Sequence, residues 1–348
     1  MTSKKSVKIG KVTIGGGKPV AVQSMTNTIT SDIAKTVAQI KRLEEAGCQI
    51  VRVAIPDEKS ARAIKTIKEK IKIPLIADIH FNYKLALLAI EAGADKIRIN
   101  PGNISHPKKL GEIIKEARKA KIPIRIGVNS GSLERDLLKK HKHPTAKALV
   151  ESLMRHVRFF EKHNFKNLVL SIKSTSVTET IEAHRLIAKK TNYPLHIGIT
   201  EAGIPEAGAV KSAVGIGVLL AEGIGDTIRV SLTADPVEEV RVGYEILKAL
   251  GLYQQGADVI SCPTCGRMNG PVEKIAREIY RKTRCIKKPL KIAVMGCEVN
   301  GPGEAKEADL GLACGPKFAS LFKKGKVLRK VPVSRASQEL LKEIPPCK

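Results

Sequence analysis

The first 250 residues alternate eight times between a short β-branched run and a longer helical pattern. Each short run follows a glycine or proline signal, and each gap between runs is long enough for one helix. Eight β/α units of this size predict a closed parallel (β/α)8 barrel of the TIM type. The expected strands are Pro19–Thr26, Gln49–Ile55, Pro74–Ile79, Lys96–Asn100, Pro123–Asn129, Asn167–Lys173, Pro194–Thr200 and Thr227–Leu232.

A doubly wound open sheet is the alternative arrangement of such units. It is disfavoured because no run is followed by GxGxxG, the glycine pattern that cradles a dinucleotide. Gly215-Ile-Gly217 lacks the third glycine and lies inside an apolar helical pattern. Between the fifth and sixth strands, Leu138–Pro144 (LKKHKHP) is expected to be a basic loop that leads into a helix over Thr145–His163. His141 and His143 in this loop are expected to be surface histidines and not metal ligands.

The alternation ends after Leu250, where a second domain is expected. Gly251–Ile260 contains no Lys or Arg and is interpreted as a connector. The chain therefore divides into a barrel domain over residues 1–250 and a small α+β domain over residues 251–348. In the second domain we expect a helix at Val272–Lys282, strands at Lys291–Met295 and Ala308–Ala313, a hairpin across Leu321–Pro332 and a helix at Ser334–Ile344.

The composition narrows the classes of function. Lys and Arg number 61 against 34 Asp and Glu, a net charge of +27, so the surface attracts anions. Aromatic residues make up only 3% and Trp is absent, which disfavours a nucleic-acid protein that stacks bases. No apolar run approaches the ~18 residues of a membrane span, and no apolar stretch follows the basic N-terminus, so no secretory signal is expected. The odd number of cysteines, seven, favours a reducing cytoplasm over a disulfide scaffold.

The carboxyl ends of the predicted strands carry polar and cationic side chains. Barrel enzymes place their chemistry at these ends, whereas a purely structural barrel fills its interior with Val, Ile and Leu. Buried cations need partners or an anionic ligand, and Arg binds phosphate through two parallel hydrogen bonds. The sequence therefore predicts a polyanionic ligand, with a diphosphate as a good match. The residues concerned are Arg52, Arg98, Asn100, Arg125, Asn129, Ser171, Lys173, Arg229 and Ser231.

Carboxylates offer an alternative interpretation of the same cations. Asp78, Glu201, Asp226 and Asp235 would pair with them in structural salt bridges. Glu201, near so much positive charge, would equally serve as an acid–base group. His196 is expected to be a hydrogen-bonded core histidine.

Six of the seven cysteines lie after residue 260. Cys262 and Cys265 form a CxxC pair, and Cys297 follows 32 residues later. A zinc ribbon would need a second CxxC, which is broken here because position 300 is Asn. Cys285 and Cys314 would complete a four-cysteine zinc site, but Cys285 lies in a basic stretch that suits the surface and Cys314 follows an apolar strand that suits burial.

The other interpretation of the cysteines is three thiolates and an oxygen ligand. Thiolates suit an iron–sulfur cluster, and three of them leave one iron with an exchangeable partner. Glu304 follows Gly-Pro-Gly, a turn that would aim its carboxylate back at such a site. A barrel protein with a structural zinc that binds phosphorylated ligands or nucleic acid is retained as the alternative.

The segments CPTCGR at 262–267 and GCEVNGPGEA at 296–305 resemble the signature of the (E)-4-hydroxy-3-methylbut-2-enyl diphosphate synthase family. These are [4Fe-4S] enzymes of the non-mevalonate isoprenoid pathway. Glu298 departs from the family pattern, which often has an apolar residue there. The resemblance extends to VQSMTNT at 22–28, RINPGN at 98–103, IGVNSGSL at 126–133, GITEAG at 198–203 and EGIGDTIRVSLTADP at 222–236.

The resemblance implies a function and a set of site residues. The implied reaction is the two-electron reductive ring opening of 2-C-methyl-D-erythritol 2,4-cyclodiphosphate, with loss of water. The implied cluster ligands are Cys262, Cys265, Cys297 and Glu304, with Glu201 near the reacting ring. The implied substrate contacts are Arg52, Arg98, Arg125, Asn129, Lys173, Arg229 and Ser231.

The resemblance and the topology also imply partners. The sequence contains no flavin or nicotinamide motif, so an acidic ferredoxin or flavodoxin is expected to supply the electrons. The last barrel helix ends at the face opposite the strand ends, and the connector Gly251–Ser261 spans at most ~40 Å. We therefore expect a head-to-tail homodimer in which each cluster domain caps the barrel of the partner.

Overall fold

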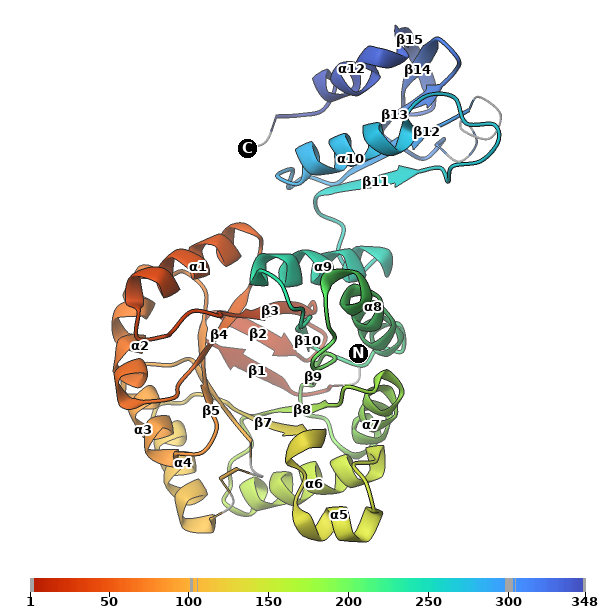
Figure 1. The fold of residues 1–348 in the computed structure, drawn as a ribbon. Coiled ribbons are helices and arrows are strands. Elements are labelled where there is room, and N and C mark those ends of the chain that lie inside the picture. Colours follow the sequence, from red (N-terminus) through yellow and green to blue (C-terminus); the bar gives the residue numbers. More distant parts are fainter. Residues whose placement is uncertain (1–2, 101–102, 105, 298–302, 304, 347–348) are drawn as a thin grey trace. The chain divides into compact units, whose positions relative to one another are not determined.

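The structure is a computed structural model that describes residues 3–100, 103–104, 106–297, 303 and 305–346. The chain forms two compact units, residues 1–252 and residues 253–348. Figure 1 draws both units, and each is described here by itself.

The first unit is a parallel eight-stranded barrel with the strand order β8-β7-β6-β5-β4-β3-β10-β9. A parallel bridge between Leu170 and Leu195 joins the two ends of this order and closes the ring. All eight strands predicted from the sequence are confirmed. They are β3 (Ala21–Met25), β4 (Ile50–Ala54), β5 (Leu75–Ile79), β6 (Lys96–Ile99), β7 (Ile124–Asn129), β8 (Leu168–Lys173), β9 (His196–Ile197) and β10 (Thr227–Ile228).

Helices surround the barrel, and several begin at a side chain that accepts a hydrogen bond from the first turn. Asp32 accepts from the backbone N–H of Lys35 at the start of α1, and Thr145 accepts from Ala148 at the start of α6. The barrel helices are α1 (Ile33–Glu45), α2 (Glu58–Lys70), α3 (Tyr83–Glu91), α4 (Pro107–Lys119), α5 (Arg135–His141), α6 (Ala146–Lys162), α7 (Val177–Lys190), α8 (Pro205–Ala221) and α9 (Pro236–Ala249), with a 3-10 turn, η1, at Ser130–Ser132.

The sequence did not predict the hairpin that closes the amino-terminal end of the barrel. The antiparallel pair β1 (Ser6–Ile9) and β2 (Val12–Gly15) lies across the ring of strands in Figure 1. Three of its side chains, Val7, Ile9 and Ile14, pack in one buried cluster with Ala21, Ile50, Ile76 and Val169, which are barrel residues on four strands. Apolar side chains therefore predominate at this end of the barrel, where the fully buried Lys96, paired with Ile76, is an exception.

The interpretation of Leu138–Pro144 as a loop was wrong for its first half. Helix α5 extends to His141, with Lys139, Lys140 and His141 in its last turn, where cations interact favourably with the helix dipole. Glu151 on α6 contacts Lys140 and His141 at 2.9 and 3.0 Å, so α6 holds this basic segment in helical form.

The second unit is a five-stranded sheet with the order β11-β12-β13-β14-β15. Strands β11 to β13 are parallel, and β14 and β15 form an antiparallel hairpin beside them. Helices α10 and α12 share a buried apolar cluster with one face of this sheet. The elements are β11 (Ala257–Ser261), α10 (Val272–Thr283), β12 (Leu290–Met295), β13 (Leu310–Cys314), β14 (Phe318–Lys323), β15 (Lys326–Pro332), a 3-10 turn η2 (Val333–Arg335) and α12 (Ala336–Lys342).

The helices, strands and hairpin predicted in this unit are confirmed, but the predicted connector, Gly251–Ile260, is too long because its second part belongs to a strand. Residues 257–261 pair in register with β12 and form β11. Sequence analysis missed this strand because it is short and its side chains are only partly buried. Among the described residues, no helix combines the length and the apolar character that crossing a membrane requires.

His184 gives the barrel a pH-dependent stability that can be measured. The ring is fully buried in α7, and Nδ1 lies 2.8 Å from the carbonyl oxygen of Thr180. Burial lowers the pKa of His184 to about 4. The unfolded chain, with a pKa of ~6.5 for histidine, therefore binds a proton between these values that the folded chain does not bind.

We predict that wild-type protein loses about 2 kcal/mol more unfolding free energy than His184→Gln when the pH falls from 7 to 5. Urea denaturation at both pH values, followed by circular dichroism, measures this difference. His143→Gln, whose ring is exposed on a loop, should keep the wild-type pH dependence. Equal pH dependence of His184→Gln and wild type would contradict the prediction.

Candidate active site

A cavity of about 250 Å³ opens at the carboxyl ends of the barrel strands. Every substrate contact predicted from the sequence lines this one cavity. Five further residues also line it without having been assigned to it beforehand: Met25, Asp78, His80, Gly127 and Thr200, together with Ser171, which was expected to point inward. The predicted contacts found here are Arg52, Arg98, Arg125, Asn129, Lys173, Arg229 and Ser231.

Two glycines make room for the cations of the cavity. A Cβ atom at Gly127 would lie 3.0 Å from Nε of Arg98. A Cβ atom at Gly198 would lie 2.9 Å from Nζ of Lys173 and 2.3 Å from the carbonyl oxygen of Arg229. Arg98 and Lys173 lie beside these positions of the neighbouring strands, where a glycine leaves the space that their long side chains occupy.

Asp78 on β5 is the carboxylate at the centre of the cationic cluster. Arg98 Nη1 donates to its Oδ1 at 3.0 Å, and Arg52 Nε lies 3.5 Å from its Oδ2. His80 Nε2 also lies 3.5 Å from Oδ2. Burial tends to raise the pKa of Asp78, but Arg52, the hydrogen bond with His80, and Arg98 and Arg125 together hold that pKa far below its usual range. Asp78 is therefore ionised throughout the physiological range.

Glu239 on α9 is a second buried carboxylate that sequence analysis missed. It is 4% exposed, and its Oε1 accepts hydrogen bonds from the backbone N–H of Leu232 at 3.0 Å and from Arg229 Nη2 at 3.4 Å. Ser24 Oγ donates to its other oxygen at 3.1 Å. Glu239 thus holds Arg229 at the mouth. The sequence does not indicate this role, because Glu239 is on helix α9 and not at the end of a barrel strand.

The carboxylates proposed as salt-bridge partners behave differently from one another. Asp78 does pair with the pocket arginines, so the salt-bridge interpretation holds for that residue. Asp235 pairs with Arg42 at 2.6 Å on the surface, and Asp226 accepts hydrogen bonds from Ser3 and from the backbone of Leu195. Glu201 is exposed on the loop after β9 and has a φ of 52°, a left-handed conformation that is uncommon for a residue with a side chain.

The positive charge in the pocket, and at Lys96 at the start of β6, exceeds what these carboxylates neutralise. In the described part of the chain, Arg125 Nε and Nη1, Arg98 Nε, Arg229 Nε and Lys96 Nζ are buried with no hydrogen-bond partner. Burial and the neighbouring arginines lower the pKa values of Lys173, Arg125 and Lys96 well below their usual ranges. Burial, opposed by Asp78, lowers the pKa of Arg52 to about 10. An anion in the cavity would relieve both the unsatisfied donors and the mutual repulsion.

His196 confirms the expectation of a core histidine. It is fully buried on β9, and its Nδ1 lies 2.7 Å from the hydroxyl of Thr227. Burial and the nearby cations lower its pKa well below the usual range, so the ring is neutral.

In the second unit, the topology brings two of the predicted cysteines to one edge of the sheet. Cys262 directly follows β11 and Cys297 follows β12, its parallel neighbour, in which Ser261 is paired with Val294. The backbone N–H of Gly296 donates to Cys262 Sγ at 3.0 Å, and a Cβ atom at Gly296 would come within 3.2 Å of that sulfur. Cys265 is exposed on the same loop, and none of these three cysteines forms a disulfide.

Glu304, the fourth predicted ligand, and Glu298 lie outside the described residues. Within the described residues, no three Cys, His, Asp or Glu side chains are close enough together to hold a metal ion. The ligand assignment therefore stays a prediction. The structure contributes thiols that form no disulfide, on loops that leave adjacent parallel strands, with a backbone amide that donates to one sulfur. This set of donors fits a thiolate-ligated cluster.

The two other cysteines considered for a zinc site are separated from each other. Cys314 ends β13, is fully buried, and has a pKa raised to about 11 by burial and by nearby Cys262. Cys285 is exposed and disulfide-bonded, in the segment that leads into the start of β12, at the opposite end of that strand from Cys297. A four-cysteine site that includes Cys285 is therefore disfavoured.

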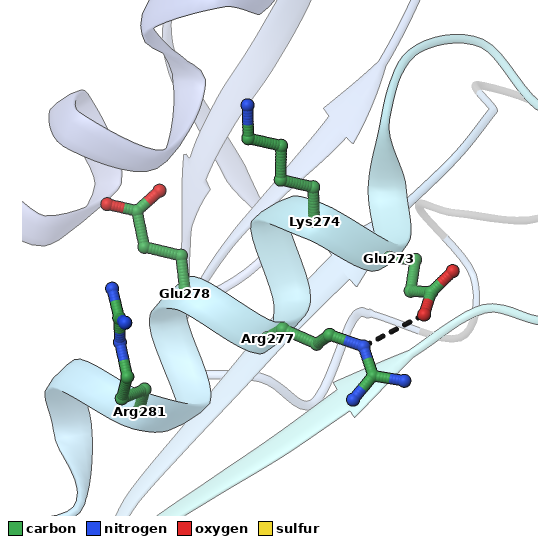
Figure 2. Close-up of a pocket in the computed structure, with 5 residues that line it drawn as sticks. All are labelled: Glu273, Lys274, Arg277, Glu278 and Arg281. Carbon is green, nitrogen blue, oxygen red and sulfur yellow. Dashed lines mark hydrogen bonds and ion pairs between the residues drawn. The ribbon is translucent and has the colours of Figure 1, made fainter.

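A second hollow lies along helix α10 and is lined by charged side chains of that helix (Figure 2). Figure 2 shows the ion pair between Arg277 and Glu273, whose atoms are 2.8 Å apart. Charges of opposite sign spaced four residues apart are typical of a solvated helix face. We assign this hollow no role.

Comparisons with known proteins place both units in one family. Residues 4–244 match the GcpE TIM-barrel domain and residues 258–345 match the GcpE protein C-terminal domain. A protein of Caldanaerobacter subterraneus subsp. tengcongensis is 59% identical, covering 98% of this chain and 96% of its own length. A Bacillus subtilis protein is 54% identical, covering 99% and 91%. Both relatives are named 4-hydroxy-3-methylbut-2-en-1-yl diphosphate synthase (flavodoxin).

A solved structure supports the barrel fold alone. Type I 3-dehydroquinate dehydratase from Clostridium difficile is 12% identical, with a TM-score of 0.50 over 72% of this chain and 98% of its own chain.

The dependence of the cationic cluster on Asp78 can be tested by removing one charge. We predict that Asp78→Asn lowers the free energy of unfolding by about 3 kcal/mol, because Arg52 and Arg98 would then be buried without a counter-charge. Saturating pyrophosphate should restore part of this lost stability, because it would bind the cationic cavity of the folded protein. Urea denaturation with and without pyrophosphate measures both effects.

Asp136→Asn is the matched control, because Asp136 pairs with Arg155 on the surface, where both side chains are about half exposed. It should cost less than about 1 kcal/mol. An equal loss of unfolding free energy in the two variants would show that Asp78 does not stabilise the buried arginines Arg52 and Arg98.

Proposed function

The chain belongs to the GcpE family, and on this premise we propose that it opens 2-C-methyl-D-erythritol 2,4-cyclodiphosphate reductively to (E)-4-hydroxy-3-methylbut-2-enyl diphosphate. The protein is an oxidoreductase of isoprenoid biosynthesis by the names of its relatives. The substrate takes up two electrons, its ring opens at one C–O bond, and one hydroxyl group leaves as water after protonation. The non-enzymatic alternative, a zinc protein that binds nucleic acid, is not favoured.

The observation that carries this proposal is the barrel cavity with its surplus of buried cationic donors. Arg52, Arg98, Arg125, Lys173 and Arg229 all line it. A cyclic diphosphate would accept hydrogen bonds from these donors, and its negative charge would offset their repulsion. Asn129 and Ser231 would contact the remaining oxygens from the ends of their strands.

Substrate binding should also fix the charge state of the pocket. Lys173 lies among arginines with its pKa well below the usual range. A bound diphosphate would raise that pKa again and favour the ammonium form, which holds phosphate oxygens more strongly. Glu201 is exposed on the loop after β9 and is not among the residues that line the cavity. We propose that it donates the proton that the leaving hydroxyl requires, as the family resemblance implies.

Residues 1–250 would thus be the substrate-binding domain and residues 251–348 the cluster-binding domain. We propose Cys262, Cys265, Cys297 and Glu304 as ligands of a [4Fe-4S] cluster. Such a cluster, when bound, supplies electrons singly and offers one iron with an exchangeable ligand. The amide of Gly296, which donates to Cys262 Sγ, would lower the electron density on that sulfur.

The relatives' name supports an electron donor as a partner, and we propose a flavodoxin or ferredoxin for that role. We propose the cytoplasm as the compartment, because five cysteines in the described part of the chain are outside disulfide bonds, with Cys285 as the exception.

We further propose the head-to-tail homodimer expected from the sequence. With β11 beginning at Ala257, the free connector shortens to residues 251–256, which span at most about 22 Å. Helix α9, with 14 residues, is itself about 21 Å long and ends at the face opposite the cavity. The connector would be almost fully extended after returning along the length of α9 to the cavity end of the barrel. We therefore propose that the cysteines serve the partner's cavity and not the cavity of their own chain.

The ligand assignment is tested by Cys262→Ser. We predict that this variant, purified without oxygen, loses the brown colour, most of its iron and sulfide, and more than 99% of turnover, on the order of a hundredfold or greater, because a hydroxyl is a poor substitute for a thiolate ligand. The control is Cys48→Ala, which removes a buried thiol of the barrel. Full colour and activity in Cys262→Ser would reject the assignment.

Shared active sites are tested by mixing two inactive proteins. Cys265→Ser disables the cluster domain and Lys173→Met disables the cavity. In a head-to-tail dimer, half of the randomly mixed dimers carry one intact site, so activity should recover to about a quarter of the wild-type level. If verified heterodimers recover no activity, each site is built from a single chain.

A further inference from the structure

The hairpin β14–β15 concentrates positive charge on the cysteine-bearing unit. From Leu310 to Gln338 the sequence contains seven Lys and Arg residues and no Asp or Glu. One of them, Arg329, is engaged with α12, where it pairs with Glu339 and Glu343 at 3.2 and 2.8 Å. The others are exposed: Lys317, Lys323, Lys324, Lys326, Lys330 and Arg335.

Large apolar side chains are exposed among these cations. Phe318 is 52% exposed, Val327 65% and Leu328 45%. Val327 is paired with Phe322, which packs with Ala293 and other residues on the sheet face away from α10 and α12. Because alternate residues of a strand share a face, Phe318 lies on this same face. Lys330 pairs with Ser320, which is on this face, whereas Lys326 pairs with Lys323 at the turn of the hairpin, on the face toward α12. We call Phe318, Val327, Leu328, Lys317 and Lys330, with Lys326 at the rim, the hairpin patch.

Protection of an edge strand explains only half of this pattern. Strand β15 is the outer strand of its sheet, and lysines on such strands prevent edge-to-edge aggregation. Exposed Val, Leu and Phe at the same place would promote aggregation and have no protective use. An apolar centre with a charged rim is instead the composition of a protein–protein interface.

One end of the hairpin patch, at Phe318, lies close to the predicted cluster ligands within the same sheet, and Val327 and Leu328 extend from there toward the turn of the hairpin. The end of β13 at Cys314 pairs with the start of β14 at Ala319, so Phe318 lies at the edge where Cys262 and Cys297 follow their strands. Strand β14 is two strand spacings from β12, about 10 Å. Cys262 itself packs against the apolar cluster that contains Phe322. A protein bound on the patch would thus be near the thiols.

We propose that the hairpin patch is the docking surface for an acidic electron-carrier protein, which rests on the proposed function. Three features identify this partner: the patch is cationic, its centre is apolar, and it adjoins the site that must receive electrons. Contact between the hairpin patches of two copies is disfavoured, because it would bring two basic faces together.

The experiment compares binding and turnover in matched charge variants. Lys326→Glu/Lys330→Glu reverses two charges of the patch. The control Lys65→Glu/Lys115→Glu reverses two exposed charges on barrel helices α2 and α4. A third variant, Val327→Thr/Leu328→Thr, removes apolar area and keeps the charge. The probe is an oxidised flavodoxin of strongly negative net charge, titrated against holoenzyme by calorimetry at low ionic strength.

We expect the patch charge variant to raise the flavodoxin dissociation constant about tenfold and the control about twofold or less. The apolar variant should weaken binding to a similar extent, with less dependence on salt. Turnover driven by a small chemical reductant should match the wild type in all three variants, because none alters the cavity or the cysteines.

Two results would overturn the proposal. One is flavodoxin affinity in both patch variants within twofold of the control; the other is a change of oligomeric state in those variants with flavodoxin binding unchanged, which would identify a second copy as the occupant. If the glutamate variant folds poorly, Lys326→Gln/Lys330→Gln replaces it. Failure of the wild type to turn over with the chemical reductant would instead count against the proposed function. The flavodoxin affinities would still show whether the hairpin patch is the docking surface.

Discussion

One buried carboxylate against several buried guanidinium groups is the constraint on which the barrel depends. Asp78 contacts both Arg52 and Arg98, and Arg125 lies near enough to lower its pKa. Removing charges of one sign from water is costly, and a single counter-charge compensates only part of that cost. The folded protein thus keeps a pocket whose electrostatic balance is completed by an anionic ligand.

The same constraint explains how the fold divides its interior. Apolar residues fill the amino-terminal end, where the β1–β2 hairpin packs, and the polar residues lie toward the carboxyl end. The small residues of the motifs IGVN and IGIT provide the space that long cationic side chains need, as Gly127 and Gly198 show. Apolar packing therefore predominates in one half of the barrel interior, and the cavity lies in the other half.

Sequence periodicity was sufficient for the barrel strands because buried parallel strands are continuous apolar runs between glycine and proline. It failed where structure depends on distant contacts. Helix α5 is held by Glu151, β11 exists through pairing with β12, and Glu239 reaches Arg229 from outside the barrel. The cationic cavity was predictable because inward positions alternate along each strand. The arrangement of Cys262, Cys265 and Cys297 was predictable only as far as adjacent strands bring Cys262 and Cys297 to one edge.

The β1–β2 hairpin closes the amino-terminal end of the barrel, so in the part of the chain that the structure describes the cavity opens at the carboxyl ends of the strands. Ligand, product and expelled water share one route, so nothing can leave while another body covers the rim. In the homodimer proposed above, the partner's cluster domain would have to move away from the cavity once per cycle, and the rate of this motion would limit turnover. Because the fully buried Ile9 and Ile14 close the amino-terminal end, the exchange of ligand and product depends on the accessibility of the carboxyl end alone.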